Sequence, residues 1–166
     1  MKEQQNFFPH IVIYLLCLVS SMFNYADFEL VSFASSMPML DLITIFYFCI
    51  YRKLVSLWMV FVMGLVIDSM SGGIFGVTSL TYIVVLKIFH LFEIKKVSAE
   101  EFLYVVKRFV IFVAAILIFK SIILIVIDDF VFNMFYVLFQ VVITSFAYIL
   151  GHKIFEDFYK KYFFER

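Results

Sequence analysis

Six long apolar segments, separated by short charged stretches, constrain the fold of this chain more than any other feature. They cover residues 10–25, 30–51, 54–70, 77–92, 102–127 and 131–155. A helix needs roughly 20 apolar residues to cross a bilayer, so six crossings with short connections use most of the 166 residues. The sequence therefore predicts an all-α integral membrane protein, with residues 1–166 forming a single polytopic domain.

The composition supports the same placement. The chain is 65% hydrophobic and 16% charged, whereas soluble domains are about half apolar and about a quarter charged. Too little polar surface is left to cover a globule in water. The 13 basic and 13 acidic residues balance, so net charge gives no reason to expect a nucleic-acid partner. Cys17 and Cys49 lie inside apolar segments without CxxC spacing, and we interpret them as small core residues.

The distribution of basic residues predicts the orientation. Every Lys and Arg except Lys87 and Lys120 lies at an end or connection that a six-span model places on one side. The alternate connections carry acidic residues instead, such as Asp27 and Asp129. Short loops rich in Lys and Arg stay in the cytoplasm. We therefore expect six transmembrane helices with both termini cytoplasmic.

Four ionisable residues fall at membrane depth: Asp41, Asp68, Lys87 and Lys120. Such groups cost at least a few kcal/mol in lipid, so each needs a partner or a water-filled surrounding. A rise of ~1.5 Å per helical residue puts Asp41 level with Lys87, and Asp68 level with Lys120. We interpret them as two interhelical clamps, or as lysines whose side chains extend to the nearest membrane interface. A proton or substrate path remains the alternative.

The last segment carries a polar stripe, because Gln140, Thr144, Tyr148 and His152 recur at every fourth residue. This spacing puts the four side chains on one helix face, which must contact other helices or a cavity rather than lipid. Hydrogen bonding between helices is the favoured interpretation.

Catalytic and metal-binding patterns are missing from the sequence. His10, His90 and His152 lie on different segments, so no two of them have the spacing of metal ligands on one helix. HExxH, P-loop and nucleophile-elbow motifs do not occur. We expect a non-catalytic protein without a metal or cofactor.

Several small or helix-capping residues predict local structure. Pro38 predicts a kink in the second segment or a short interfacial piece before the span proper. Residues 98–101 have the form of a capping box. Gly72 and Gly76 predict a tight turn between the third and fourth segments. Gly64, inside the third segment, is the candidate for close helix packing.

Pro38, Gly64, Asp68, Gly72 and Gly76, with the residues next to them, together resemble the pattern of the rod shape-determining membrane protein family MreD. The resemblance covers about a quarter of the chain, in residues 38–42, 64–68, 72 and 76–82. The family pattern has a Pro near the second span, Gly-Leu-Leu-x-Asp in the third, and a Gly-containing turn before the fourth. The residues that match are Pro38, Gly64, Asp68, Gly72 and Gly76. Residues 74–75, Ile-Phe, depart from the Pro-Leu that is common in the family.

The resemblance implies a multi-pass protein of the bacterial inner membrane that supports lateral peptidoglycan synthesis and cell shape. It implies MreC as a partner and, through MreC, a transpeptidase and its glycosyltransferase. It also implies a fold similar to the substrate-binding subunits of vitamin transporters.

Joined with the physical reasoning, the resemblance suggests a scaffold whose groove receives a partner's single transmembrane helix. Gly64 and polar residues such as Gln140 are expected near that partner. Asp68 is expected to organise the outer hairpin, through Lys120 or the amides around Gly72. The alternative function is a small-molecule capture or transport subunit whose site lies inside the bundle. Asp41, Lys87 and Gln140 would line that site.

Overall fold

The computed structural model describes residues 3–25, 37–72, 74–92, 102–128 and 134–163, and no strand occurs among them. The elements are α1 (Glu3–Tyr25), α2 (Leu40–Ile45), the π-helical segment η2 (Phe46–Tyr51), α3 (Leu57–Ser71), α4 (Val77–Phe92), α5 (Phe102–Asp128) and α6 (Met134–Phe163). The prediction of an all-helical chain is confirmed.

The helix ends follow the charged and glycine-rich stretches of the sequence. The predicted segment 77–92 coincides with α4, and the predicted segment 102–127 lies within α5. Of the predicted segment 30–51, the structure describes a helix over residues 40–51 only. Residues 30–36 of this segment and the predicted capping box at 98–101 lie outside the described residues. Of the two structures expected at Pro38, a kink is not seen, because α2 begins only after this residue; a separate short piece before the helix is the alternative that agrees with this start.

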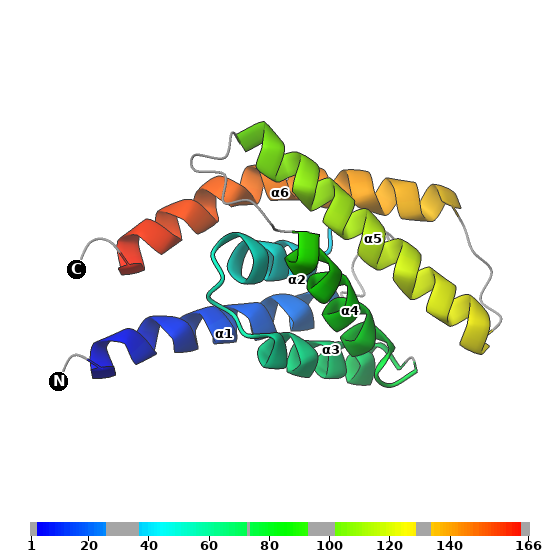
Figure 1. Ribbon diagram of the computed structural model, residues 1–166, viewed down its shortest axis with the longest axis horizontal. Helices are drawn as coiled ribbons and strands as arrows, with labels where there is room; N and C mark the ends of the chain where they lie inside the picture. The colour runs from blue at the N-terminus through cyan, green and yellow to red at the C-terminus, as the bar shows by residue number, and fades with distance from the viewer. Residues whose placement is uncertain (1–2, 26–36, 73, 93–101, 129–133, 164–166) are drawn as a thin grey trace.

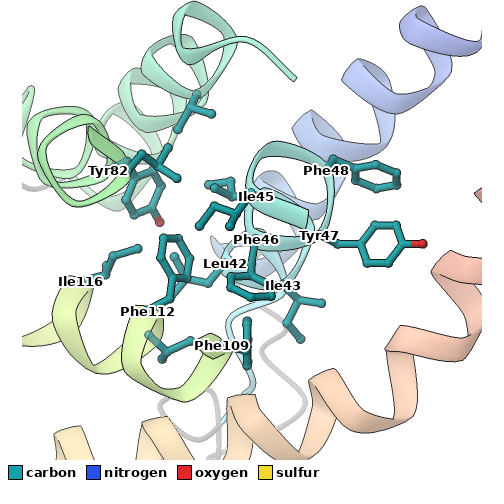
Figure 2. Packing of buried hydrophobic residues seen from close by; sticks show 14 of the residues in the cluster. Leu42, Ile43, Ile45, Phe46, Tyr47, Phe48, Tyr82, Phe109, Phe112 and Ile116 are labelled. Carbon is teal, nitrogen blue, oxygen red and sulfur yellow. The ribbon is translucent and has the colours of Figure 1, made fainter. Parts of the chain in front are cut away.

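The short helix formed by α2 and η2 lies in the middle of the molecule (Figure 1). Residues 41–48 are each 3% exposed or less. Phe46 packs against Phe109, Phe112 and Tyr148, with ring centroids 5.1 to 5.5 Å apart (Figure 2). A helix that is apolar on all sides lies in a protein core or in a membrane, and here α2 is buried within the protein.

The remaining helices form a ring around this central helix. Helix α1 packs against α3, α3 against α4, α4 against α5, and α5 against α6. Figure 1 shows α1 and α3 along one side of α2, with α5 and α6 along the other. Among the described residues, α1 and α6 are not a closely packed pair. The ring is therefore open between α1 and α6, with α2 behind the opening.

Two helices of the described chain are long and apolar enough to cross a membrane. Their apolar spans are Phe102–Ile127 in α5 and Met134–Lys160 in α6. The apolar stretches of the other helices are shorter. The first turn of α1 and the last turn of α6 lie at the same end of the molecule, whereas the connection from α3 to α4 lies at the opposite end (Figure 1).

Candidate functional site

The carboxylate of Asp68 caps the start of a neighbouring helix. Helix α3 ends at Gly72, whose φ of +62° is a left-handed conformation that suits glycine. The chain then turns into α4, and Asp68 accepts hydrogen bonds from the amides of Gly76 at 2.8 Å and Thr78 at 3.2 Å. The first amides of a helix have no partner within it. Asp68 thus ties α3 to the N-terminus of α4, where a negative charge is also favoured.

This arrangement specifies the predicted role of Asp68. The expected amide donors were those around Gly72 and Gly73, and Gly73 lies outside the described residues. The described donors are the amides of Gly76 and Thr78, at the start of α4. The expected ion pair with Lys120 does not form among the described side chains. Lys120, on α5, lies within electrostatic range of both Asp68 and Asp41 instead.

The second embedded acid, Asp41, binds a tyrosine. Asp41 on α2 is 2% exposed, and its carboxylate accepts a hydrogen bond from the hydroxyl of Tyr82 on α4. Figure 2 shows the Tyr82 side chain pointing from α4 toward the central helix. The expected pair with Lys87 does not form, because Lys87 is exposed and lines a groove elsewhere. The sequence analysis missed Tyr82, although a tyrosine hydroxyl within an apolar helix calls for a partner.

Gly64 provides the closest contact between α3 and α4. A Cβ atom added to Gly64 would lie 2.5 Å from the Cα of Ser79 and 2.6 Å from its amide nitrogen. Real side chains do not approach backbone this closely, so only glycine fits. The expectation that Gly64 contacts a partner protein is corrected here: Gly64 is buried, and its open face is filled by Ser79 of the same chain.

The polar stripe of α6 is buried, and its first two members hold the segment that leads into α2. The side-chain amide nitrogen of Gln140, Nε2, donates a 2.7 Å hydrogen bond to the backbone carbonyl of Met37. The hydroxyl of Thr144 accepts one from the amide of Met39 at 3.3 Å. These contacts flank Pro38, which has no amide hydrogen of its own. The extended residues before α2 are therefore fastened to α6 on both sides of the proline.

The other two members of the stripe belong to an aromatic cluster. The Tyr148 ring stacks on Phe109 with centroids 4.1 Å apart, and its hydroxyl lies 3.1 Å from Nδ1 of His152. The imidazole of His152 also packs edge-on against the ring of Tyr47, with ring centroids 5.6 Å apart. The stripe thus joins α6 to η2 and α5 in the core.

Arg52 joins the end of η2 to the last turns of α6. It follows η2, and its guanidinium lies 4.1 Å from the ring centroid of Tyr159 on α6. Burial lowers the pKa of Arg52. The hydrogen bond from its Nε to the Tyr47 hydroxyl and the electrostatic interactions with Tyr47, Tyr51 and Tyr159 together raise that pKa above its ordinary value. Arg52 therefore stays charged, as a cation–π contact requires.

A groove lies at the opening between α1 and α6. It has a volume of about 380 Å³, with Thr44 of α2 at its floor. The Ser20 hydroxyl of α1 lies 2.9 Å from that of Thr44 and fixes α1 against the floor. On the α6 side, Ala147 and Gly151 line the groove one turn apart. Small residues at this spacing leave room for another backbone to approach closely.

The polar groups of the core have structural uses. Asp68 caps a helix, Asp41 joins α2 to α4, and Gln140 fastens the chain before α2. Within the described ranges, no group of three or more His, Cys, Asp or Glu side chains is placed to hold a metal ion. Comparisons with protein-family models, curated proteins and solved structures found no match for this chain.

Proposed function

We propose that this protein is a non-catalytic membrane scaffold whose groove between α1 and α6 holds the single transmembrane helix of a partner. The opening between α1 and α6 carries the proposal, because the described helices pack in sequence around α2 from α1 to α6 and an apolar groove lies where this order ends. The groove is floored by the central helix and rimmed by α1 and α6. The proposal follows from membrane placement, from the lining of the groove and from the resemblance to MreD, in that order.

Membrane placement is supported by the outer surface. Only 22% of each apolar window in α5 and α6 is buried within the protein, whereas the core helix of a soluble protein is mostly buried. Val126 is 78% exposed and Phe135 is 85% exposed. Large apolar side chains of this kind recur along the outer faces of both helices. Exposed apolar patches of this extent need a partner or a lipid environment.

The lining of the groove suits a helix better than a small molecule. In lipid, helices associate through close packing and a few hydrogen bonds, since the hydrophobic effect does not drive them together. Ala147 and Gly151 allow close approach, and the two hydroxyl-bearing residues of the lining, Ser20 and Thr44, bond to each other, which leaves an apolar surface for packing. We infer that the partner presents a small residue where it crosses Gly151.

The core disfavours the alternative of a capture or transport subunit. That alternative needs Asp41, Lys87 and Gln140 around one open cavity. Asp41 bonds to Tyr82, and Gln140 bonds to the carbonyl of Met37. Of the three, Lys87 alone lines a groove among the described residues. The pairing of these groups between helices supports a scaffold.

The resemblance to the MreD family gives the partner its identity in this proposal. MreC, a protein with one membrane span, would occupy the groove and connect the scaffold to the transpeptidase and glycosyltransferase of lateral wall synthesis. The protein would be a multi-pass component of the bacterial inner membrane, with six spans and both termini in the cytoplasm. The start of α1 and the end of α6 lie at the same end of the molecule, which supports placing both on one side of the membrane (Figure 1).

Co-purification from membranes tests the proposal. Gly151→Leu fills the groove, and we expect it to lower the recovery of MreC at least tenfold. Val142→Leu is the matched control, because Val142 is 65% exposed on α6 and does not line the groove. Both variants must reach the membrane in equal amounts. Recovery of MreC with Gly151→Leu at the level of the control would refute the groove as the binding site.

A further inference from the structure

A second groove lies away from the opening between α1 and α6. It has a volume of about 480 Å³ and runs between the end of η2, the following turn and the last turns of α4. Its surface is mainly apolar and includes Ile50, Leu86 and Leu91. This size and lining are typical of sites that bind small ligands.

Three basic side chains line the same groove. Lys87 and His90 lie three residues apart on α4 and so share one helix face. Lys53 comes from the turn after η2. The groove thus combines an apolar surface with positive charge from two separate elements. Lys87 does not pair with Asp41, as the sequence analysis expected, but lines this groove with the other two basic residues.

The backbone at Lys53 adds an independent observation. Lys53 has a φ of +55°, a left-handed conformation that side chains other than glycine rarely adopt. This turn lets the amide of Leu54 donate a 2.8 Å hydrogen bond to the carbonyl of Phe48, which closes the end of η2. Glycine is the usual residue at such a helix end. A lysine is therefore kept where the backbone favours glycine, and strain of this kind clusters at binding sites.

We propose that this groove binds an anionic phospholipid, with its phosphate between Lys53, Lys87 and His90 and an acyl chain along the apolar surface. The inference rests on the membrane placement in the proposed function, but not on the partner helix. Charge complementarity selects the ligand, since lysine ammonium groups bind phosphate as point charges. A soluble phosphate would leave the apolar surface unused, and the net negative charge of an anionic lipid matches a groove whose described lining contains basic but no acidic side chains.

The lysines set the expected effect. Each basic residue near an anionic lipid surface contributes about fivefold in affinity. Replacing both lysines should therefore weaken binding on the order of twentyfold, while replacing Lys87 alone should weaken it about fivefold.

Native mass spectrometry of the full-length protein in detergent tests the site. The probes are phosphatidylglycerol, phosphatidylcholine and glycerol phosphate. We expect one phosphatidylglycerol bound per chain, with weaker binding of the other two probes. The variants are Lys53→Gln/Lys87→Gln, Lys87→Gln alone and the charge-preserving Lys87→Arg. The control is Lys107→Gln/Lys153→Gln, because these exposed lysines lie outside the groove.

The proposal predicts weaker binding of phosphatidylglycerol by both Gln variants, more so by the double variant, and unchanged binding by Lys87→Arg and by the control. Equal binding of phosphatidylcholine would overturn the choice of an anionic lipid. Equal affinity for glycerol phosphate would show a site for soluble phosphates instead. Unchanged phosphatidylglycerol binding by Lys87→Gln would overturn the site even if the double variant fails to fold. Recovery of MreC from the same membranes tests the groove between α1 and α6. A failure of the lipid proposal can therefore be distinguished from a failure of the proposed function.

Discussion

The hydroxyl of Tyr82 donates a hydrogen bond to the carboxylate of Asp41, and this contact joins the central helix α2 to α4. Both side chains are buried, with exposed fractions of 3% and 2%. A buried carboxylate that loses its donor keeps the full cost of its desolvation. The contact therefore sets how firmly the central helix is held.

Tyr82→Phe should destabilise the protein by about 1–2 kcal/mol, because it removes the donor and leaves the carboxylate buried. Asp41→Asn should cost less, since the amide oxygen still accepts the hydrogen bond. Thermal unfolding of purified protein in detergent, followed by far-ultraviolet circular dichroism, measures both. Tyr104→Phe is the control, because Tyr104 is 48% exposed. Equal melting temperatures for Tyr82→Phe and Tyr104→Phe would contradict this role.

Asp68→Ala should destabilise the start of α4 by about 1–2 kcal/mol, as expected for loss of an N-terminal cap. Hydrogen exchange resolves the effect locally, and the amides of Gly76 and Thr78 should exchange faster. Ser69→Ala is the matched control, since the exposed Ser69 hydroxyl bonds only within its own helix. If exchange at Thr78 does not change in Asp68→Ala, the carboxylate does not cap α4.

Gly64→Ala should destabilise the protein by more than about 2 kcal/mol, because even one methyl group would overlap the backbone of Ser79 and force α3 away from α4. Gly151→Ala is the comparison, since a Cβ there would meet only the ring of Phe155 at 3.6 Å. Thermal unfolding of the two variants separates the cases. A Gly64→Ala protein as stable as Gly151→Ala would mean that α3 and α4 do not pack this closely.

Lys53→Gly should stabilise the protein by about 0.5–1 kcal/mol, because glycine adopts the left-handed conformation at this turn without strain. The same variant should bind phosphatidylglycerol more weakly, since it removes one of the charges in the groove. Gain of stability with loss of lipid binding is the expected pair of results. A lower melting temperature would show that the lysine side chain itself stabilises the turn.

The positions of the helix ends could be predicted from the sequence, but the direction in which each helix face points could not. The Gly-rich turn and the charges beyond residue 92 predicted both ends of α4, because such residues interrupt apolar helices. Depth along the chain placed Asp41 level with α4 but could not choose between Tyr82 and Lys87, since that choice depends on how α4 is rotated.

The central position of α2 was also beyond sequence reasoning. In a membrane protein both the lipid-facing and the core-facing sides of a helix are apolar, so the pattern of residues 40–51 does not show which sides are buried. The groove between α1 and α6 depends on this placement. Its lining residues therefore could not be selected before the structure was known.

Site-specific photo-cross-linking in native membranes tests the scaffold proposal most directly. A photoreactive residue replaces Leu16 or Val19 in the groove, or Val142 or Phe146 on the outer face of α6. Mass spectrometry then identifies the cross-linked peptide. The proposal predicts adducts with the transmembrane helix of MreC from the groove positions and none from the outer positions. MreC adducts from the outer face alone, with none from Leu16 or Val19, would contradict it.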